Sequence, residues 1–453
     1  MLRELLARYD KPVPRYTSYP AVPHWDAEQF GVASWLESLQ EAMIRYETLG
    51  ITLYIHLPYC ERLCTYCGCN KHITTNHAVE YPYREAVLSE WEMYRQVFGK
   101  KPLLRGIHLG GGTPTFFSAQ SLDKLLSGIM NESQVFSADF EGSVEVHPTV
   151  TSSEQLEVLH KFGFRRLSAG IQDIDPKVQF IINRVQPKKE TIRVIEEARK
   201  IGYDQINVDL VYGLPLQTYS SISETLEHVL ELLPDRIAYY GYAHVPWKSK
   251  GQRRYTEKDL PDAETKRNMY LRAYQVLTSS EYESIGMDHF ARSNDALFKA
   301  RQESRLHRNF MGYTTQHTPV MIGLGASAIS DCGSAYSQNY KTPKEYLERI
   351  SQKQFPIDKG HILTTEDMLI KGHILDLMCY YETRVDDITS KSNWWKRVHQ
   401  NMAGVIADGL VAISDKDVKI SLSGRPFVRN IASCFDPYFN RQLPDSPTFS
   451  KSI

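Results

Sequence analysis

The chain of 453 residues is 42% hydrophobic, enough for a large buried core arranged as two or three domains or as one barrel with appendages. Its net charge of −1 excludes a global field that would attract nucleic acid or anionic membranes. No run approaches about 18 uninterrupted apolar residues, and the N-terminus lacks the apolar core of a signal peptide. We therefore expect neither a membrane span nor secretion.

Cysteine use indicates the compartment. The chain has seven cysteines, an odd number, and three of them are scattered (Cys332, Cys379 and Cys434). This is typical of free thiols in a reducing cytosol and not of a disulfide framework. We expect a cytoplasmic protein with no nucleic-acid partner.

Strands and helices are predicted to alternate through the first half of the chain. The segments between the strands have apolar residues at helical spacing, with Ser118, Thr151 and Ser221 as predicted N-caps. Six such units in sequence predict a parallel sheet that curls toward a barrel, and an open doubly wound sheet is the alternative. The predicted strands, rich in β-branched and aromatic residues, are 52–57, 105–111, 142–148, 165–172, 206–215 and 236–246.

Polar residues, cysteines or glycines follow every one of these strands. Because the carboxyl ends of parallel strands meet on one face, where barrel active sites form, the sequence predicts a single shared site there. In chain order the residues are a cysteine-rich loop, the stretch GGGTPT (110–115), Glu145 with His147, Gln172 with Asp173, Asp209, and Tyr242 with His244.

The pattern changes after about residue 250. A helix is predicted near 262–280, and a small, mostly helical domain of winged-helix-like order is predicted from residue 361. Its balanced charge argues against DNA binding and favours a structural or lid role. We predict three segments: an N-terminal extension (1–48) that covers the site, a barrel domain (49–360) and the C-terminal domain (361–453).

The cysteine-rich loop contains Cys60, Cys64 and Cys67 at C-x3-C-x2-C spacing, with Cys69 two residues later. A structural zinc site is one interpretation, although no second ligand pair is present. Thiol redox chemistry is another, although it needs no third thiol. We favour an iron–sulfur cluster, because three thiolates would leave one iron open to a small molecule.

The stretch GGGTPT offers backbone N–H groups with no side chains to block a close approach. It lacks the GK[ST] ending of a phosphate-binding loop. Beside the cysteine loop, it predicts a cradle for a polar amino-acid group.

The cysteine spacing, with Tyr66 before the last cysteine and GGGTPT downstream, resembles the radical S-adenosylmethionine (SAM) superfamily. PRYTSYP (14–20), CGCNK (67–71) and LHRNF (306–310) make nearly the whole chain similar to the oxygen-independent coproporphyrinogen III oxidase family. The resemblance implies an α/β fold with a partial (β/α)6 barrel. It also implies a [4Fe–4S] cluster on Cys60, Cys64 and Cys67, with Cys69 in the motif but not a ligand, and two SAM molecules.

The resemblance further implies roles for individual residues. Tyr54, Gly111 and Glu145 would contact the first SAM. Met311 stands where the family often has Gln, so a polar contact near the second SAM would be weaker here. His147 and Ala21 also depart from the family pattern. The residues implied at the second SAM or between the two are Tyr66, Gly112, Thr113, Gln172, Arg184, Asp209, Ala243 and Ile329, and the implied catalytic positions are Tyr54, Glu145, Met311 and Ile329.

The implied reaction is the anaerobic oxidative decarboxylation of two propionates of coproporphyrinogen III to vinyl groups, giving protoporphyrinogen IX in haem biosynthesis. The reaction would use a 5′-deoxyadenosyl radical made from SAM and an electron donor such as a flavodoxin or ferredoxin. We expect the enzyme to be a monomer. The substrate has four carboxylates, so a basic and aromatic lining is expected. The candidates are Arg15, Tyr16, Tyr19, Arg292, His307 and Arg308.

Two rival functions share the barrel and the cysteine loop. One is a radical SAM methyltransferase that opens the haem ring, and the other is a haem-binding chaperone of the same family. The N-terminal PRYTSYP segment and the HRNF segment favour the oxidase.

Overall fold

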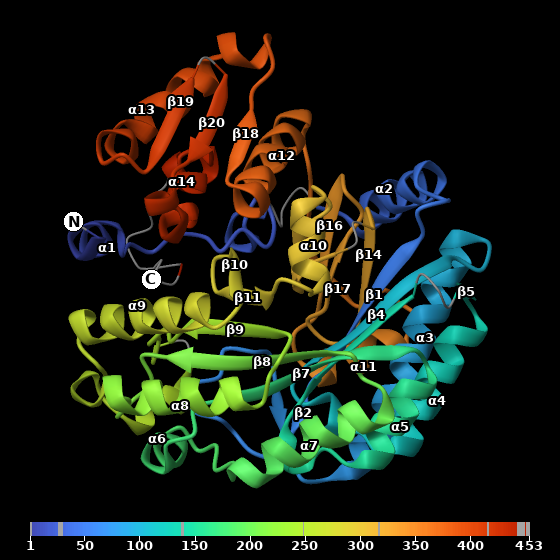
Figure 1. Ribbon diagram of the computed structural model, residues 1–453. Coiled ribbons are helices and arrows are strands. Elements are labelled where there is room, and N and C mark those ends of the chain that lie inside the picture. Colours follow the sequence, from blue (N-terminus) through green and yellow to red (C-terminus); the bar gives the residue numbers. More distant parts are fainter. Residues whose placement is uncertain are drawn as a thin grey trace. The chain divides into compact units, whose positions relative to one another are not determined.

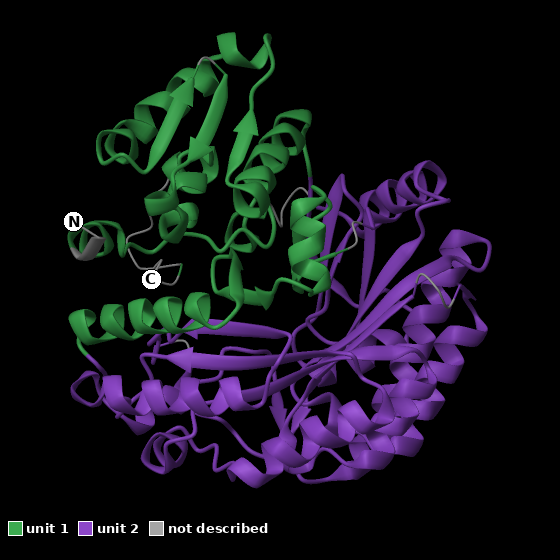
Figure 2. Ribbon diagram, viewed as in Figure 1, with its two compact units in different colours: residues 1–25, 262–317, 363–453 green, residues 26–261, 318–362 purple. Residues whose placement is uncertain are grey.

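The computed structural model describes residues 2–25, 30–136, 140–247, 249–315, 318–414, 416–441 and 449. Contacts divide the chain into two units, each built from separate stretches (Figure 2). Unit 1 comprises residues 1–25, 262–317 and 363–453, and unit 2 comprises residues 26–261 and 318–362. The predicted division at residues 48 and 360 stays a prediction.

Unit 2 contains all six predicted strands, parallel and hydrogen-bonded in chain order. A doubly wound sheet would reverse its strand order part-way, so the consecutive order confirms the barrel-like interpretation and excludes the alternative. The last two strands are shorter than predicted, because Gly213 turns with φ +80° after β8 and a loop follows Gly241. The strands are β1 (Ile51–Leu57), β4 (Leu103–Gly111), β6 (Glu141–Val146), β7 (Phe164–Gln172), β8 (Gln205–Tyr212) and β9 (Arg236–Gly241).

The sheet continues on the other side of β1. Strand β14 (Val320–Leu324) pairs with β1 in parallel, and β15 (Ile329–Asp331), β16 (Ala335–Asn339) and β17 (Ile357–Ile362) follow as antiparallel neighbours. The short strand β5 (Gln134–Val135) pairs with β4. This extension brings residues from the late part of the chain beside the first strand.

Helices cover the outer side of this sheet (Figure 1). Apolar strand residues that face them, such as Leu53, Val144 and Val208, are 1% exposed or less. The alternate positions, such as Glu145 and Asp209, are polar and only partly buried. The inner face of the sheet is therefore polar, as a ligand-binding surface requires. The helices of unit 2 are α2 (Val32–Arg45), α3 (Glu80–Phe98), α4 (Ala119–Asn131), α5 (Ser153–Lys161), α6 (Pro176–Ile181), α7 (Lys188–Ile201), α8 (Tyr219–Glu231) and α11 (Pro343–Ser351).

One of the three predicted N-caps is confirmed. The Ser118 hydroxyl accepts from the backbone N–H of Ser121 at the start of α4. The other two predictions were wrong by one and three residues: Ser152 caps α5 and Thr218 caps α8, each in a capping box. Ser221 is the third residue of α8 and completes its capping box.

Unit 1 combines the two ends of the chain with residues 262–317. The N-terminal residues Leu5, Leu6, Tyr16 and Tyr19 share a buried apolar core with the C-terminal helices. The predicted helix near 262–280 is α9 (Ala263–Ser279). The remaining elements before residue 318 are α1 (Leu2–Tyr9), β10 (Tyr282–Gly286), β11 (His289–Arg292), α10 (Ala296–Gln302), β12 (His307–Asn309) and β13 (Gly312–Thr314).

The C-terminal part of unit 1 combines helices with three short strands. Helix α12 (Thr365–Tyr380), β18 (Glu382–Arg384), α13 (Asn393–Ala407), β19 (Val411–Ser414) and β20 (Asp417–Ile420) precede α14 (Val428–Ser433) and α15 (Pro437–Arg441). The three strands form an antiparallel sheet in the order β18-β20-β19. The winged-helix likeness and the covering role of the N-terminal extension stay predictions. Of the described helices, none combines the length and apolarity needed to cross a bilayer.

A fully buried carboxylate, Glu90 of α3, holds the turn after β14. It accepts hydrogen bonds from Gly325 N (2.8 Å), Tyr346 Oη (2.7 Å) and Asn339 Nδ2 (2.7 Å). Burial raises the pKa of Glu90 to about 7, although these three donors counteract the shift. The carboxylate thus joins α3, α11 and the β14–β15 turn.

Replacing this carboxylate leaves the buried Gly325 N–H and Tyr346 hydroxyl without this acceptor, while the Asn339 amide keeps only its hydrogen bond to Gly325 O (2.9 Å). We expect Glu90→Ala to lower the free energy of unfolding in urea by about 3 kcal/mol, since each unsatisfied buried donor costs about 1–3 kcal/mol. Glu92→Ala on the same helix is the matched control, because Glu92 pairs with Arg95 at the surface. Equal stability of the two variants would contradict an anchoring role for Glu90.

Candidate active site

The cysteine loop is closed by a short parallel bridge. Strand β2 (Tyr59–Cys60) pairs with β3 (His72–Ile73), and His72 N donates to Pro58 O (2.7 Å). Within the loop, Cys67 N donates to Cys64 O (3.2 Å). Cys60, Cys64 and Cys67 are free thiols that are partly exposed. The end of β1 thus presents all three sulfurs on one small loop.

The segment after α6 supports this loop from the side. Ile182 O accepts from Thr65 N (2.9 Å), and Asn183 Nδ2 donates to Leu63 O (2.8 Å). Arg184 Nη1 lies 3.7 Å from Cys64 Sγ. Residues from the fourth strand–helix unit therefore fix the loop that follows the first strand.

The thiols differ in acidity. A hydrogen bond from Cys69, together with the Lys71 charge, lowers the pKa of Cys67 to about 6 despite burial. Burial raises the pKa of Cys60 to about 11, partly offset by Thr113 Oγ1 at 3.3 Å. The Cys67 thiol thus loses its proton more readily than the Cys60 thiol, and the thiolate is the form that binds metal.

The described residues contain no group of three His, Cys, Asp or Glu side chains that converges as on a single metal ion. Three thiolates on a [4Fe–4S] cube each bond a different iron, so their sulfurs need not converge on one point.

The glycines after β4 allow two strand ends to touch. Gly111 has φ +115°, and a Cβ on it would lie 2.8 Å from the His56 ring. A Cβ on Gly112 would lie 2.6 Å from the Pro58 backbone. The N–H groups of Gly112 and Thr113 donate to the carbonyls of Leu57 (2.8 Å) and Tyr59 (3.0 Å).

This arrangement narrows the predicted cradle. The N–H groups of Gly112 and Thr113 are already used by the backbone of β1 and β2, so these two are not free to bind a ligand, and the cradle over the remaining residues of 110–115 stays a prediction. The glycines are required because any side chain would separate the two strand ends.

A row of polar side chains lines the inner face beside this turn. Tyr54 and His108, paired in register on β1 and β4, stack at 5.8 Å and 18°. His108 Nε2 lies 3.3 Å from Glu145 Oε1, and its Nδ1 lies 2.6 Å from Ser143 Oγ. Burial would raise the pKa of Glu145, but His108 and the Gly111 N–H hold it below its usual value. Glu145 is therefore an anion.

His108 and Ser143 were missed by the sequence analysis. Strand alternation could have found His108, because it lies two residues before Gly110 and faces the same side as Tyr54. Ser143 precedes Glu145 by two residues and shares its face for the same reason.

Asp209 and Arg184 contribute opposite charges to the same face. Ser168 Oγ (3.0 Å) and Asn207 Nδ2 (2.9 Å) donate to Asp209, while burial and the Glu145 charge raise the pKa of Asp209 to about 6. Arg184 is buried and donates to Gly170 O (2.7 Å). Its Nε is buried and has no hydrogen-bond partner among the described residues.

The other predicted cofactor residues lie around this row. Gln172 is buried in a left-handed conformation (φ +69°). Gln252, which the sequence analysis missed, donates to the carbonyls of Tyr66 (3.5 Å) and Ala243 (3.2 Å). Ile329 begins β15, directly after the turn that Glu90 holds.

The predicted substrate residues and Met311 all belong to unit 1. Arg15 is ion-paired with Asp288, and Arg292 Nη2 lies 3.3 Å from Glu281. Tyr16 Oη donates to Asp436 (3.1 Å). Tyr19 is buried, and its hydroxyl has no hydrogen-bond partner in the described part of the chain.

Arg308 differs from the other basic candidates. It is 4% exposed, and its guanidinium lies 4.7 Å over the Tyr313 ring. Its Nη2 donates to Arg15 O (3.4 Å), but Nε and Nη1 are buried with no hydrogen-bond partner among the described residues. His307 and Met311 flank it: His307 begins β12, and Met311 N donates to Asn309 Oδ1 (2.9 Å) in the β12–β13 turn.

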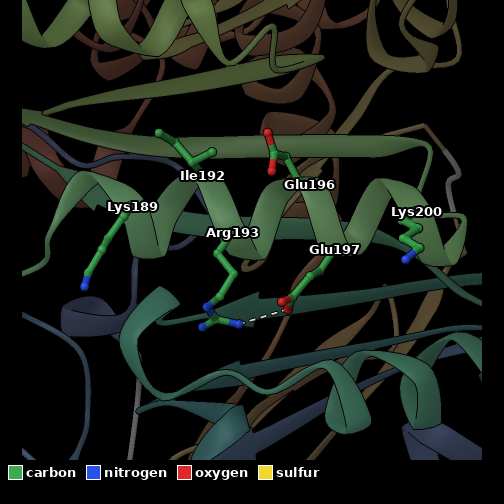
Figure 3. A pocket seen from close by; sticks show the side chains of 6 residues that line it. All are labelled: Lys189, Ile192, Arg193, Glu196, Glu197 and Lys200. Carbon is green, nitrogen blue, oxygen red and sulfur yellow. Dashed lines mark hydrogen bonds and ion pairs between the residues drawn. The ribbon is translucent and has the colours of Figure 1, made fainter.

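A hollow of about 380 Å³ on unit 2 lies away from these residues. Figure 3 shows that its lining comes from one helix, α7, where Arg193 and Glu197 form an ion pair of 2.9 Å. It contains none of the predicted site residues, so it is a surface feature of the helix.

Known proteins match nearly the whole chain. Residues 54–229 match the radical SAM superfamily model. The chain is 36% identical to the oxygen-independent coproporphyrinogen III oxidase of Escherichia coli, over 99% of this chain and 98% of the relative. The enzyme of that name from Salmonella typhimurium is 37% identical over the same shares.

The chain belongs to the oxygen-independent coproporphyrinogen III oxidase family. A solved structure, coproporphyrinogen III oxidase (HemN) from Escherichia coli, described as a radical SAM enzyme, matches with a TM-score of 0.88 and 35% identity, over 94% of this chain and 100% of that one. The predicted family, the α/β barrel fold and the enzyme class are thus confirmed, and the two rival functions are not favoured.

Radical SAM enzymes use a [4Fe–4S] cluster and SAM, and the residues of this family member fit both. Three thiols lie on one loop, as the open-site cluster requires. The buried, unpartnered Nε of Arg184 can donate to a carboxylate, and the Glu145 anion can accept from an ammonium group.

The contact between the glycine turn and the cysteine loop can be tested by adding one methyl group. We expect Gly112→Ala to cost about 2 kcal/mol of stability and to remove most of the bound iron, because its Cβ would overlap the Pro58 backbone. Iron and sulfide are assayed after anaerobic reconstitution.

Gly68→Ala is the control for this variant. Gly68 lies inside the cysteine loop, and a Cβ on it would have no atom within 4 Å. It should keep its iron. Full iron content in Gly112→Ala would contradict the required close approach.

Proposed function

We propose that this chain catalyses the oxidative decarboxylation of two propionate side chains of coproporphyrinogen III, giving protoporphyrinogen IX. The observation that carries this proposal is the match to named coproporphyrinogen III oxidases along 99% of the chain, which includes unit 1 as well as the barrel. The radical SAM model alone, over residues 54–229, would support only the superfamily.

Cys60, Cys64 and Cys67 would hold the cluster, and Cys69 would remain a hydrogen-bond donor to Cys67. When bound, the cluster would supply the one electron needed to cleave SAM to methionine and a 5′-deoxyadenosyl radical able to take a hydrogen from the propionate β-carbon; formation of the vinyl group would then release CO2 and pass one electron to an external acceptor. Thr113 supports the first ligand, since its hydroxyl lies 3.3 Å from Cys60 Sγ.

The charged residues of the inner face would orient the polar parts of SAM. Glu145 is kept anionic by His108, so it suits an ammonium group. Arg184 offers a buried Nε–H to a carboxylate. Asp209, with its pKa raised to about 6, is largely ionised at neutral pH and suits ribose hydroxyls or a sulfonium charge.

The number of SAM molecules is also part of the proposal. We propose two. The first would contact Tyr54, Gly111 and Glu145, and Met311 together with Ile329 would act near the reacting centre. The residues proposed for the second molecule, or for the space between the two, are Tyr66, Gly112, Thr113, Gln172, Arg184, Asp209, Ala243 and Ile329.

Among the proposed substrate residues, Arg308 has the strongest case. Arg15 and Arg292 already face carboxylates of their own chain, whereas Arg308 keeps two buried nitrogens without a partner among the described residues. A buried cation with unused donors binds a carboxylate more strongly than an exposed, paired one. The aromatic side chains Tyr16 and Tyr19 and the imidazole of His307 would add to the lining.

We also propose a monomeric, cytoplasmic enzyme that receives its electron from a flavodoxin or ferredoxin. The free state of all seven cysteines supports a reducing compartment.

One experiment tests the function directly. Reconstituted protein is incubated anaerobically with SAM, reductant and coproporphyrinogen III, and the products are analysed. We expect 5′-deoxyadenosine and protoporphyrinogen IX from the wild type and neither from Cys64→Ala.

Cys434→Ala is the matched control, because Cys434 is a thiol of unit 1, outside the cysteine loop. It should keep the wild-type rate. SAM cleavage with untouched porphyrinogen would reject the oxidase while leaving the superfamily intact. Stoichiometric zinc without iron or sulfide would reject both.

The role of Arg308 can be separated from that of SAM binding. We expect Arg308→Met to lower kcat/KM for coproporphyrinogen III about 10- to 100-fold, as loss of a hydrogen bond to a charged group costs about 1.5–3 kcal/mol. The Kd for SAM should not change.

Arg384→Met serves as the control, since Arg384 is paired with Asp417 at the surface (2.9 Å) and is not among the proposed substrate residues. Its kcat/KM should stay close to that of the wild type. An unaltered kcat/KM in Arg308→Met would remove Arg308 from the substrate site.

A further inference from the structure

Five exposed cations lie on the segments that border the cysteine loop. Arg62 is in the loop itself, Lys177 is in α6, and Lys250, Arg253 and Arg254 are in the 3₁₀ helix η6 (Lys250–Arg254). We call this group the basic collar. Its charge stands out in a chain whose net charge is only −1.

The three segments of the basic collar touch one another. Asn183, two residues after α6, donates to Leu63 O (2.8 Å). A Cβ on Gly251 of η6 would lie 3.3 Å from Leu63 and 3.4 Å from Thr65. The Arg254 guanidinium lies 5.2 Å over the Phe180 ring of α6. The cations therefore surround one region of surface next to Cys64.

The collar cations are not neutralised by nearby carboxylates. Among the described residues, none of the five has an ion-pair partner, whereas Arg8, Arg95 and Lys161 elsewhere are all paired.

The nearby acidic groups have other partners. Asp175 accepts from the backbone N–H groups at the start of α6, Asp259 accepts from Thr256, and Glu61 faces His77 at 3.6 Å. These three carboxylates keep their charge, but the exposed cations outnumber them, and Glu257 and Lys258 of the adjacent segment offset each other. The surface beside the cysteine loop therefore carries a net positive charge.

Large apolar side chains are exposed on or near the same segments. Phe180 is 66% exposed and Val185 is 60% exposed, both within a few residues of Lys177 or Arg184. Trp247 is 57% exposed shortly before η6. Exposed aromatic residues surrounded by charges are typical of a surface that binds another protein.

We propose that the basic collar is the docking surface for an acidic, low-potential one-electron carrier protein. The inference rests on the proposed function, which needs one electron at the cluster for each SAM cleaved. In the step itself, the reduced carrier loses one electron and the oxidised [4Fe–4S] cluster gains it, with no bond formed or broken. Charge complementarity selects an acidic partner and speeds its association.

The test uses two reductants on the reconstituted holoenzyme. Reduced flavodoxin, an acidic protein, is compared with dithionite, a small ion that needs no docking surface. The test variant is Lys177→Glu/Arg254→Glu. Glutamate is tolerated at the start of α6, where a helix favours negative charge. Bleaching of the cluster's visible absorption gives the rate of reduction.

We expect the second-order rate constant with flavodoxin to fall at least about 10-fold at low ionic strength, and the difference from the wild type to shrink as salt is added. Reduction by dithionite should be unchanged. The control, Lys124→Glu/Lys200→Glu, makes the same charge change on α4 and α7, outside the collar, and should behave as the wild type.

Two results would overturn the proposal: an unchanged rate with flavodoxin, or equal slowing with both reductants. A failure of the proposed function looks different. The wild-type cluster would then accept electrons from flavodoxin and cleave SAM, but coproporphyrinogen III would not be converted.

Discussion

The close contact between the ends of β1 and β4 is the constraint on which the site depends. Gly112 lies so near Pro58 that no side chain fits between them, and its N–H donates a hydrogen bond to Leu57 O. This contact places the cysteine loop, which continues from β1, beside Glu145 on the neighbouring β6. The sulfur ligands and the anionic side chain therefore belong to one compact region of the sheet, although 85 residues of sequence separate Cys60 from Glu145.

Each strand of the sheet has one apolar face and one polar face. Residues that face the helices are apolar and fully buried, and they supply the free energy that holds the barrel together. Their neighbours on the inner face carry charge and hydrogen bonds, which would be costly to bury without ligands or partners. His108 holds several side chains of the inner face in place, because it contacts Tyr54, Ser143 and Glu145 at once.

Much of this could be predicted from the sequence because the signals are local. The cysteine spacing, the six strands and the polar residue after each strand are readable within short windows. Features that depend on contacts between distant segments could not be predicted. The pairing of Gly112 N with Leu57 O, the role of Gln252, and the grouping of residues 262–317 with both chain ends are of this kind. The predicted N-cap of α8 was wrong for another reason. Thr218 and Ser221 both suit a capping box, and the sequence pattern alone does not show which of them begins the helix.

The bridge between β2 and β3 has a consequence for variants of the cysteine loop. His72 N to Pro58 O and Thr74 N to Cys60 O fasten the two ends of the loop through main-chain atoms alone. Replacing a cysteine side chain therefore leaves these two bonds in place. Such a variant loses a sulfur atom but keeps the closure of the loop.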